Sequence, residues 1–254
     1  MRIKVLGCSG GVGPGLRTTT LLVDDEILID AGTGVGELSL AQMRRIGNIF
    51  ITHSHLDHVC GLAFMADNLF DLIDRPVQIH AIAETLAALR NHIFNWKIWP
   101  DFSALPSVEN PLIKFHEVKV GETLERNGIH FTPFTVLHTV PAVGYAVEKD
   151  GHVFVFSGDT YANDPLWDFM NKLPRVDKFM VDIAFPDEEE ELGRASKHFT
   201  PSLLGRELKK LKHQPKLFLT HHKPGLEQII DKQCRKALAG WDYHHLRRGD
   251  VIEP

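Results

Sequence analysis

Three histidines and an aspartate lie within six residues, in the stretch His53-Ser54-His55-Leu56-Asp57-His58. The residues before it, 49–52, have the apolar composition of a buried β-strand, and apolar residues with helical spacing follow it as far as residue 69. The cluster must therefore lie on a loop that joins a strand to a helix. Imidazole and carboxylate groups together are typical ligands of Zn, Mn or Fe, so this loop is predicted to bind a metal.

A second interpretation makes these residues ordinary polar side chains of a surface loop. A single histidine would fit it well, but three histidines with an aspartate in this order favour the metal site. The helical HExxH pattern of zinc proteases does not occur in the sequence. Histidine is also frequent, at 15 of 254 residues, so we expect the histidines to carry the function.

The composition is that of a folded globular protein. With 43% hydrophobic and 24% charged residues, the chain is not disordered, collagen-like or a membrane bundle. No apolar stretch approaches the roughly 18 residues that a membrane span requires. The net charge of −5 argues against a surface built to bind nucleic-acid phosphates.

The three cysteines are odd in number and lack CxxC spacing. A disulfide framework is therefore not expected, and a reducing, cytoplasmic location fits better. The glycine-rich segment 7–15 misses the GxGxxG spacing of dinucleotide-binding loops, and a strand-like stretch follows it where such loops have a helix. No nucleotide cofactor is expected.

The hydrophobic pattern predicts that each half of the chain runs from strands to helices. Strands are expected at residues 3–6, 20–23, 27–30, 49–52, 77–80, 112–118, 129–137, 143–147, 153–157, 179–183 and 217–220. Helices are expected at residues 57–69, 84–94, 164–172, 201–211 and 226–238. The simplest assembly is a single domain, residues 1–254, with two sheets, outer helices and an irregular aromatic insertion around residues 94–110.

The HxHxDH pattern after a short strand resembles the signature of the metallo-β-lactamase-fold hydrolases, and the version here resembles that of the class II cyclic-nucleotide phosphodiesterases. Four further segments resemble motifs of the same family: Leu6–Gly11, Leu28–Gly34, Ser157–Thr160 and Leu219–Pro224. His198-Phe199-Thr200-Pro201 resembles both this class and the related ribonuclease Z. The resemblance implies an α/β fold, the αββα sandwich, with two mixed sheets and outer helices.

Carried over residue by residue, the resemblance implies two divalent transition metal ions, with zinc preferred and manganese or iron as alternatives. One ion would be held by His53, His55 and His138, the second by Asp57, His58 and His221, with Asp159 bridging them. Asp159 follows an apolar strand, where a carboxylate is costly unless it binds metal or is hydrogen-bonded. His222 is the rival of His221, but the family places its ligand directly after Leu-Thr.

The same resemblance implies a metal-dependent phosphodiesterase that cleaves a 3',5'-cyclic nucleotide or a similar small diester by attack of a metal-bound hydroxide. The leaving alkoxide needs a proton, for which His198 is the candidate donor and Asp182 the group that orients it. The alternative is that His198 only precedes the helix start at Thr200-Pro201. Asp57 is expected to be required for catalysis, and Asp30 to hold a metal-bound histidine.

Other functions remain open at this level. A ribonuclease Z-like tRNA nuclease is one, although that family generally uses a Gly-rich basic arm, where this chain is Trp/Pro-rich. A thioester or lactone hydrolase and a structural or storage metal site are others. The expected partner is a small phosphodiester substrate, and binding to nucleic acid or to a membrane is not expected. The sequence leaves open whether the protein forms a homodimer. The aromatic residues Trp96, Trp99 and Phe102 would cap the core, stack on a nucleobase or form a subunit interface.

Overall fold

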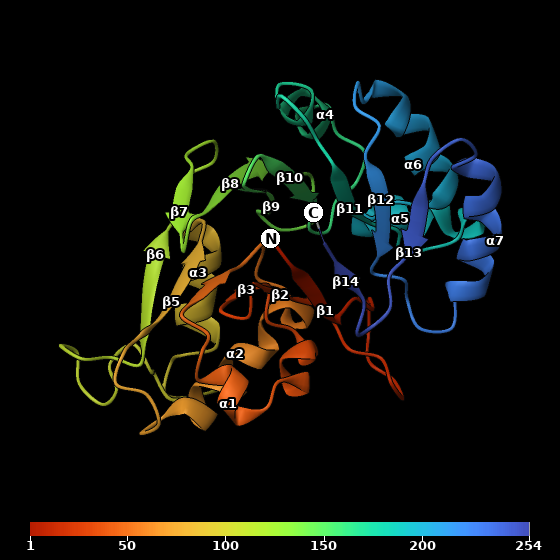
Figure 1. Ribbon diagram of the computed structural model, residues 1–254. Coiled ribbons are helices and arrows are strands. Elements are labelled where there is room, and N and C mark those ends of the chain that lie inside the picture. The colour runs from red at the N-terminus through yellow and green to blue at the C-terminus, as the bar shows by residue number, and fades with distance from the viewer. Residues whose placement is uncertain (254) are drawn as a thin grey trace.

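The computed structural model describes residues 1–253. Two seven-stranded sheets lie face to face, and helices cover the outer face of each (Figure 1). The strands are β1 (Ile3–Gly7), β2 (Thr20–Val23), β3 (Ile27–Ile29), β4 (Asn48–Phe50), β5 (Val77–Ala81), β6 (Ile113–Glu117), β7 (Leu124–Arg126), β8 (Ile129–Thr135), β9 (Val143–Lys149), β10 (His152–Phe156), β11 (Lys178–Asp182), β12 (Lys216–Thr220), β13 (Tyr243–His245) and β14 (Val251–Ile252).

Helices alternate with strands in both halves of the chain. The α-helices are α1 (Leu40–Met43), α2 (Leu56–Leu69), α3 (Ala83–His92), α4 (Asp164–Met170), α5 (Glu190–Ser196), α6 (Pro201–Glu207) and α7 (Glu227–Ala237). The 3-10 helices are η1 (Thr33–Glu37), η2 (Asp187–Glu189) and η3 (Leu208–Lys210). Across residues 1–253, every helix is too short or too polar to cross a membrane.

Both sheets are mixed and follow the same plan. The first has the order β14-β1-β2-β3-β4-β5-β6, with antiparallel pairing from β14 to β3 and parallel pairing from β3 to β6. The second has the order β13-β12-β11-β10-β9-β8-β7, with parallel pairing from β13 to β10 and antiparallel pairing from β10 to β7. β14 pairs with β1, so the two ends of the chain lie in one sheet.

The core has three apolar layers, because successive side chains of a strand point to opposite faces. In β10, Phe154 and Phe156 pack between the two sheets, whereas Val153 and Val155 pack beneath the helices of the second sheet. Leu62 of α2 belongs to the corresponding layer over the first sheet. This arrangement confirms the predicted αββα sandwich.

The chain directions bring the functional loops to one edge of the sandwich. β3 and β4 are parallel neighbours in the first sheet. In the second sheet β10, β11 and β12 are parallel, and β8 has the same direction because β9 runs antiparallel to both β8 and β10. The loops that follow these strands therefore leave each sheet at the same edge, and they carry the predicted site residues.

Every predicted strand and helix is present with its ends shifted by a few residues, but the sequence analysis missed several short elements. These are β7, β13, β14, α1, α5 and the three 3-10 helices. The predicted helix 201–211 is also divided, since α6 ends at Glu207 and η3 continues to Lys210. That residues 1–254 form a single domain stays a prediction.

The aromatic segment between α3 and β6 forms no regular helix or strand, as expected from its sequence. Phe94 and Phe102 are buried in the layer over the first sheet, so they cap that core. Trp99 packs edge-on against Phe64 of α2, with ring centroids 5.5 Å apart. Trp96, by contrast, is 62% exposed. One segment thus contributes both core and surface.

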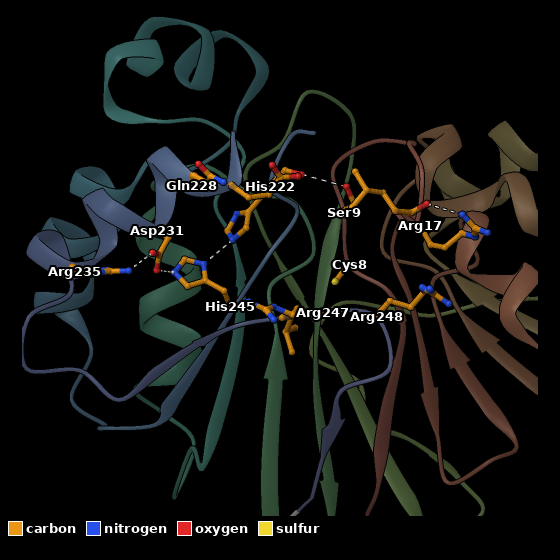
Figure 2. Close-up of a pocket in the computed structure, with 14 residues that line it drawn as sticks. Cys8, Ser9, Arg17, His222, Gln228, Asp231, Arg235, His245, Arg247 and Arg248 are labelled. Carbon is orange, nitrogen blue, oxygen red and sulfur yellow. Dashed lines mark hydrogen bonds and ion pairs between the residues drawn. The ribbon is translucent and has the colours of Figure 1, made fainter. Parts of the chain in front are cut away.

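A cavity of about 630 Å³ opens between the loop that follows β1 and helix α7 (Figure 2). Asp231 and Arg235 of α7 lie on one side of it, and Ser9 and Arg17 of the β1–β2 loop lie on the other. The cavity is therefore bounded by segments from the two ends of the chain.

Candidate metal centre and active site

The HxHxDH cluster lies on the loop between β4 and α2, as the sequence predicted. β4 ends at Phe50, and α2 begins at Leu56, so His53 and His55 lie on the loop and Asp57 lies in the first turn of the helix. A carboxylate is favourable in that turn because it faces the positive end of the helix dipole. His53 and His58 are fully buried. The loop therefore turns its polar side chains inward.

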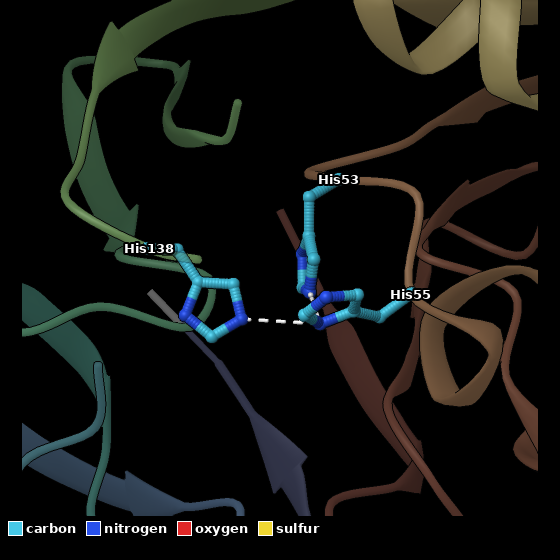
Figure 3. A group of neighbouring side chains, drawn as sticks. All are labelled: His53, His55 and His138. Carbon is cyan, nitrogen blue, oxygen red and sulfur yellow. Dashed lines mark hydrogen bonds between the residues drawn. The ribbon is translucent and has the colours of Figure 1, made fainter. Parts of the chain in front are cut away.

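Three imidazoles converge in a first ligand group (Figure 3). The Nε2 atom of His53 lies 3.2 Å from Nδ1 of His55, and Nε2 of His138 lies 3.1 Å from the same Nδ1 atom. His138 comes from the loop between β8 and β9 in the second sheet. Three ring nitrogens from two sheets thus face one point, which is the arrangement of a three-histidine metal site.

A second group mixes carboxylates and imidazoles. It contains Asp57, His58, Asp159 and His221, whose ligand atoms all lie within 4.8 Å of one another. Oδ2 of Asp57 lies 3.8 Å from Nε2 of His58 and 3.7 Å from Nε2 of His221. His221 adopts a left-handed backbone, φ 66°, and its N–H donates to the Cys8 carbonyl. This contact holds the His221 backbone in that conformation.

Asp159 lies between the two groups. Its Oδ2 is 3.2 Å from Nε2 of His58 and 3.7 Å from Nε2 of His53, and its Oδ1 is 3.2 Å from Nδ1 of His221. The side chain follows β10 and is almost completely buried. One carboxylate thus reaches imidazoles of both groups, which is the position that a bridging ligand requires.

The buried ring nitrogens fit a cationic partner. Within residues 1–253, Nε2 of His58 and both ring nitrogens of His221 are buried and form no hydrogen bond, although Asp159 oxygens lie 3.2 Å from Nε2 of His58 and from Nδ1 of His221. Buried polar atoms are almost always satisfied in native proteins, so each such atom needs an explanation. Metal ions at the two groups would satisfy these atoms, and the N/O donor set suits zinc, manganese or iron.

Asp30 orients the cluster from behind. Its Oδ2 accepts a 2.7 Å hydrogen bond from Nδ1 of His58, and its Oδ1 accepts one of 2.8 Å from the N–H of Thr52. The Thr52 hydroxyl in turn lies 3.0 Å from Nδ1 of His53. The bond to Asp30 holds the proton of His58 on Nδ1 and leaves the lone pair of Nε2 directed at the cluster.

Burial and charge set the protonation of the cluster. Burial lowers the pKa of His53 and His221 well below the usual range of histidine, and that of His138 to about 4. These rings are therefore neutral at pH 7, which metal binding requires. Burial also opposes a charge on His58, but Asp159 and Asp30 outweigh it and raise its pKa well above the usual range. A metal ion would take the place of that proton.

His198 and Asp182 form a pair at the border of the cluster. Nδ1 of His198 donates a 2.9 Å hydrogen bond to Oδ2 of Asp182, whose Oδ1 accepts one of 3.0 Å from the N–H of Thr160. The His198 ring lies 5.0 Å from that of His221 and 5.1 Å from that of His138. Through its hydrogen bond, Asp182 holds the His198 ring beside both ligand groups. Burial raises the pKa of Asp182 to about 6.

The structure brings all of the predicted site residues together at one edge of the sandwich. They are His53, His55, Asp57, His58, His138, Asp159, Asp182, His198 and His221, with Asp30 behind them. The rival His222 turns away and donates from Nδ1 to the Ile183 carbonyl. The roles assigned to the nine residues stay predictions.

Two contributors to the site escaped the sequence analysis. Thr52 precedes the motif and links Asp30 to His53. The Lys197 carbonyl lies 3.2 Å from Nδ1 of His138, and Lys197 has the left-handed backbone, φ 62°, that ends α5. The position of Thr52 beside the motif could have drawn attention to it. A backbone carbonyl leaves no such signal in a sequence.

Comparison with known proteins connects this geometry to one family. A family model described as a beta-lactamase superfamily domain matches residues 25–222. A probable 3',5'-cyclic-nucleotide phosphodiesterase of Yersinia pestis is 24% identical, over 90% of this chain and 80% of its own. A 3',5'-cyclic-nucleotide phosphodiesterase of Aliivibrio fischeri is 23% identical, over 80% of this chain and 73% of its own. A ribonuclease Z of Haloarcula marismortui is 28% identical, over 59% of this chain and 48% of its own.

Solved structures share the fold at low sequence identity. Unliganded yeast PDE1 has a TM-score of 0.82 at 18% identity and matches 98% of both chains. The metallo-beta-lactamase fold protein YhfI of Bacillus subtilis has a TM-score of 0.79 at 17% identity and matches 99% of both chains. These neighbours confirm the metallo-β-lactamase fold that the sequence motifs implied.

Proposed function

Because this chain belongs to the beta-lactamase superfamily and is a metal-dependent hydrolase of the metallo-β-lactamase fold, we propose that it cleaves a phosphodiester. The proposed substrate is small, such as a 3',5'-cyclic nucleotide. The observation that carries the proposal is the position of Asp159 between two groups of inward-facing imidazoles. Paired metal sites of this kind are typical of enzymes that displace an oxygen from phosphorus.

We propose two divalent transition metal ions, with zinc preferred and manganese or iron as alternatives. His53, His55 and His138 would hold one ion, Asp57, His58 and His221 the other, and Asp159 both. Such ions polarise the phosphoryl group and supply a hydroxide nucleophile near neutral pH. The chain's own contribution is to fix the ring directions through Asp30 and the Lys197 carbonyl, as the hydrogen bonds to His58 and His138 support.

His198 is proposed as the acid that protonates the leaving oxygen, and Asp182 as its positioning residue. The alkoxide of a sugar is a poor leaving group, so a proton donor at its oxygen accelerates the cleavage. Burial opposes a positive charge on His198, but the hydrogen bond to Asp182 and the charge of Asp159 raise its pKa above the usual value. With Nδ1 bonded to Asp182, the other ring nitrogen is left to hold the transferred proton.

Two observations favour a small diester over tRNA. The phosphodiesterase relatives of Yersinia pestis and Aliivibrio fischeri match 90% and 80% of this chain, whereas the ribonuclease Z of Haloarcula marismortui matches 59%. The net charge of −5 also opposes a polyanion. His198-Phe199-Thr200-Pro201, which resembles the ribonuclease Z motif, keeps tRNA processing as the second candidate.

All three cysteines are free thiols, which supports a cytoplasmic location.

The test compares activity and metal content in one preparation. Metal analysis of the purified protein should give about two transition-metal ions per chain. Hydrolysis of bis(p-nitrophenyl) phosphate, cyclic AMP, cyclic GMP, a tRNA precursor and a thioester is then measured side by side. We expect turnover of the diester probe and of a cyclic nucleotide. Activity on the tRNA precursor alone would establish the second candidate, and activity on the thioester alone would refute phosphodiester cleavage.

Asp57→Asn tests the site itself. Replacing a partner of a metal ligand typically costs 10–100-fold, so loss of a ligand should lower diesterase turnover by at least about a hundredfold. Asp67→Asn is the matched control, because Asp67 is an exposed residue of the same helix. Equal turnover in the two variants would remove Asp57 from the site.

A further inference from the structure

The cavity of about 630 Å³ is separate from the metal cluster (Figure 2). None of the residues proposed to bind metal lines it, and neither does His198 or Asp182. Its volume lies within the range of small-molecule sites, about 300–1,000 Å³. The cavity therefore has the size of a ligand site and is not used by the proposed reaction.

A wall of two backbone segments divides the cavity from the cluster. The N–H of Gly10 donates to the His222 carbonyl at 2.9 Å, and the Ser9 hydroxyl donates to the same carbonyl at 3.4 Å. Ser9 and His222 line the cavity. His221, one residue earlier, directs its ring to Asp159 on the cluster side. A molecule in the cavity would contact this wall and not the metal ligands.

The cavity is lined by more cationic than anionic side chains. Four arginines and two carboxylates line it, in a chain of net charge −5. Arg17 and Arg248 converge on one carboxylate, Glu37, which lies outside the lining. Arg235 pairs with Asp231 at 2.6 Å. Two guanidinium groups that share a single carboxylate retain hydrogen-bond donors for a second anion.

Arg247 is the free cation of the lining. Within residues 1–253 its guanidinium forms no ion pair, although its backbone N–H donates to Oδ2 of Asp250 at 2.9 Å. The backbone is thus fixed while the charge stays uncompensated. Guanidinium groups bind phosphate and carboxylate in a bidentate manner, so Arg247 offers the cavity a cation for an anionic group, and Arg248 is a further donor in the same lining.

The rest of the lining is mixed, with polar residues (Ser9, His222, Gln228 and His245) and apolar side chains. Leu16, Leu246 and Cys8 contribute side chains to the cavity beside the arginines. Burial raises the pKa of the Cys8 thiol to about 12, so this residue is an uncharged part of the surface. An apolar surface next to a cationic one is complementary to a molecule that carries an anionic group on an apolar body.

We propose that this cavity is a second ligand site, which binds a small phosphate monoester of nucleotide size independently of the metal cluster. The anionic group would contact Arg247 and Arg248, and the organic body would lie against Leu16 and Leu246. The site does not depend on the reaction at the metals. Binding requires only that the anion of the ligand competes successfully with water and with the Glu37 carboxylate for the arginines.

Adenosine 5'-monophosphate serves as the probe, and its binding to the metal-loaded protein is measured by calorimetry. Arg247→Ala removes the unpaired cation without breaking an ion pair. A hydrogen bond to a charged group contributes about 1.5–3 kcal/mol, so the dissociation constant should rise at least about tenfold. Arg206→Ala is the matched control, since Arg206 of α6 pairs with Glu190 of α5, outside the cavity. Its affinity should equal that of the wild type.

A second variant separates this site from the metal cluster. Asp57→Asn should retain binding of adenosine 5'-monophosphate, because Asp57 does not line the cavity. Loss of binding in Asp57→Asn together with full affinity in Arg247→Ala would overturn the proposal in favour of the metal cluster. Absence of saturable binding at millimolar probe would also overturn it. Neither result bears on diester hydrolysis, which is measured separately with bis(p-nitrophenyl) phosphate.

Discussion

Gly61→Ala tests whether close backbone contact positions the metal cluster. Gly61 lies in α2 and donates its N–H to the Ala31 carbonyl at 2.8 Å, while the N–H of Ala31 donates to the His58 carbonyl at 2.7 Å. A Cβ at Gly61 would lie 2.5 Å from the Gly32 carbonyl oxygen and 2.8 Å from that of Ala31. Both obstacles are backbone atoms, which cannot rotate away.

Two effects of opposite sign determine the result. Alanine is favoured over glycine inside a helix by about 1 kcal/mol. Ordinary contact begins near 3.4 Å, so α2 must move away from the loop by roughly 1 Å, and overpacking of this kind costs about 1–3 kcal/mol. We expect a net loss of about 1 kcal/mol and a Tm lower by about 2–4 °C. The movement also carries Asp57 and His58, so metal affinity should fall.

The assay is thermal unfolding with and without added zinc, together with metal analysis of the purified variant. Gly36→Ala is the control, because Gly36 lies in the neighbouring helix η1 and a Cβ there meets nothing within 4 Å. That variant should unfold at the wild-type temperature or slightly above it. If Gly61→Ala is more stable than the wild type and binds metal normally, the contact between α2 and the loop does not position the cluster.

Other properties of the molecule give three further predictions. Removal of metal by a chelator should lower the Tm by about 5–10 °C, because a ligand at a hundred times its Kd contributes about 2.7 kcal/mol to the free energy of unfolding. An unchanged Tm in differential scanning fluorimetry would contradict the metal site. Asp182→Asn should lower kcat for bis(p-nitrophenyl) phosphate by about 10²-fold at unchanged metal content and alter the pH–rate profile, whereas loss of metal would give Asp182 a structural role. Burial lowers the pKa of His80 to about 3 in the folded protein, whereas histidine in the unfolded chain has a pKa of about 6.5. Below pH 6.5 the unfolded chain therefore binds a proton at His80 that the folded protein does not bind, and the free energy of unfolding decreases as the pH falls. His80→Gln should therefore reduce the acid destabilisation by about 2 kcal/mol at pH 5, as measured by urea unfolding, and an identical pH dependence would show that His80 is protonated in the folded state.

The sequence predicted the layers and the cluster of candidate metal ligands because both depend on strong local patterns. Apolar alternation marks strands such as β10, where Phe154 and Phe156 alternate with Val153 and Val155. The HxHxDH motif carries four ligand candidates in one loop, which reveals the site before its distant partners are placed.

The elements that were missed depend on tertiary contacts. β13 has the sequence Tyr-His-His, which has no apolar alternation, and its pairing with β12 decides its conformation. β14 is only two residues long and exists because it pairs with β1. α1 is short, but its Ser39–Gln42 capping box was a usable signal. The cavity beside α7 joins residues from both ends of the chain, so no local pattern could indicate it.

The two ligand groups draw their members from both halves of the polypeptide. His53, His55, Asp57 and His58 follow β4 of the first sheet, whereas the remaining members follow strands of the second sheet. Neither half alone presents a complete coordination sphere. With the proposed ligands, a nascent chain would acquire its cations only after the late strands have docked, and the ions would then link the two sheets.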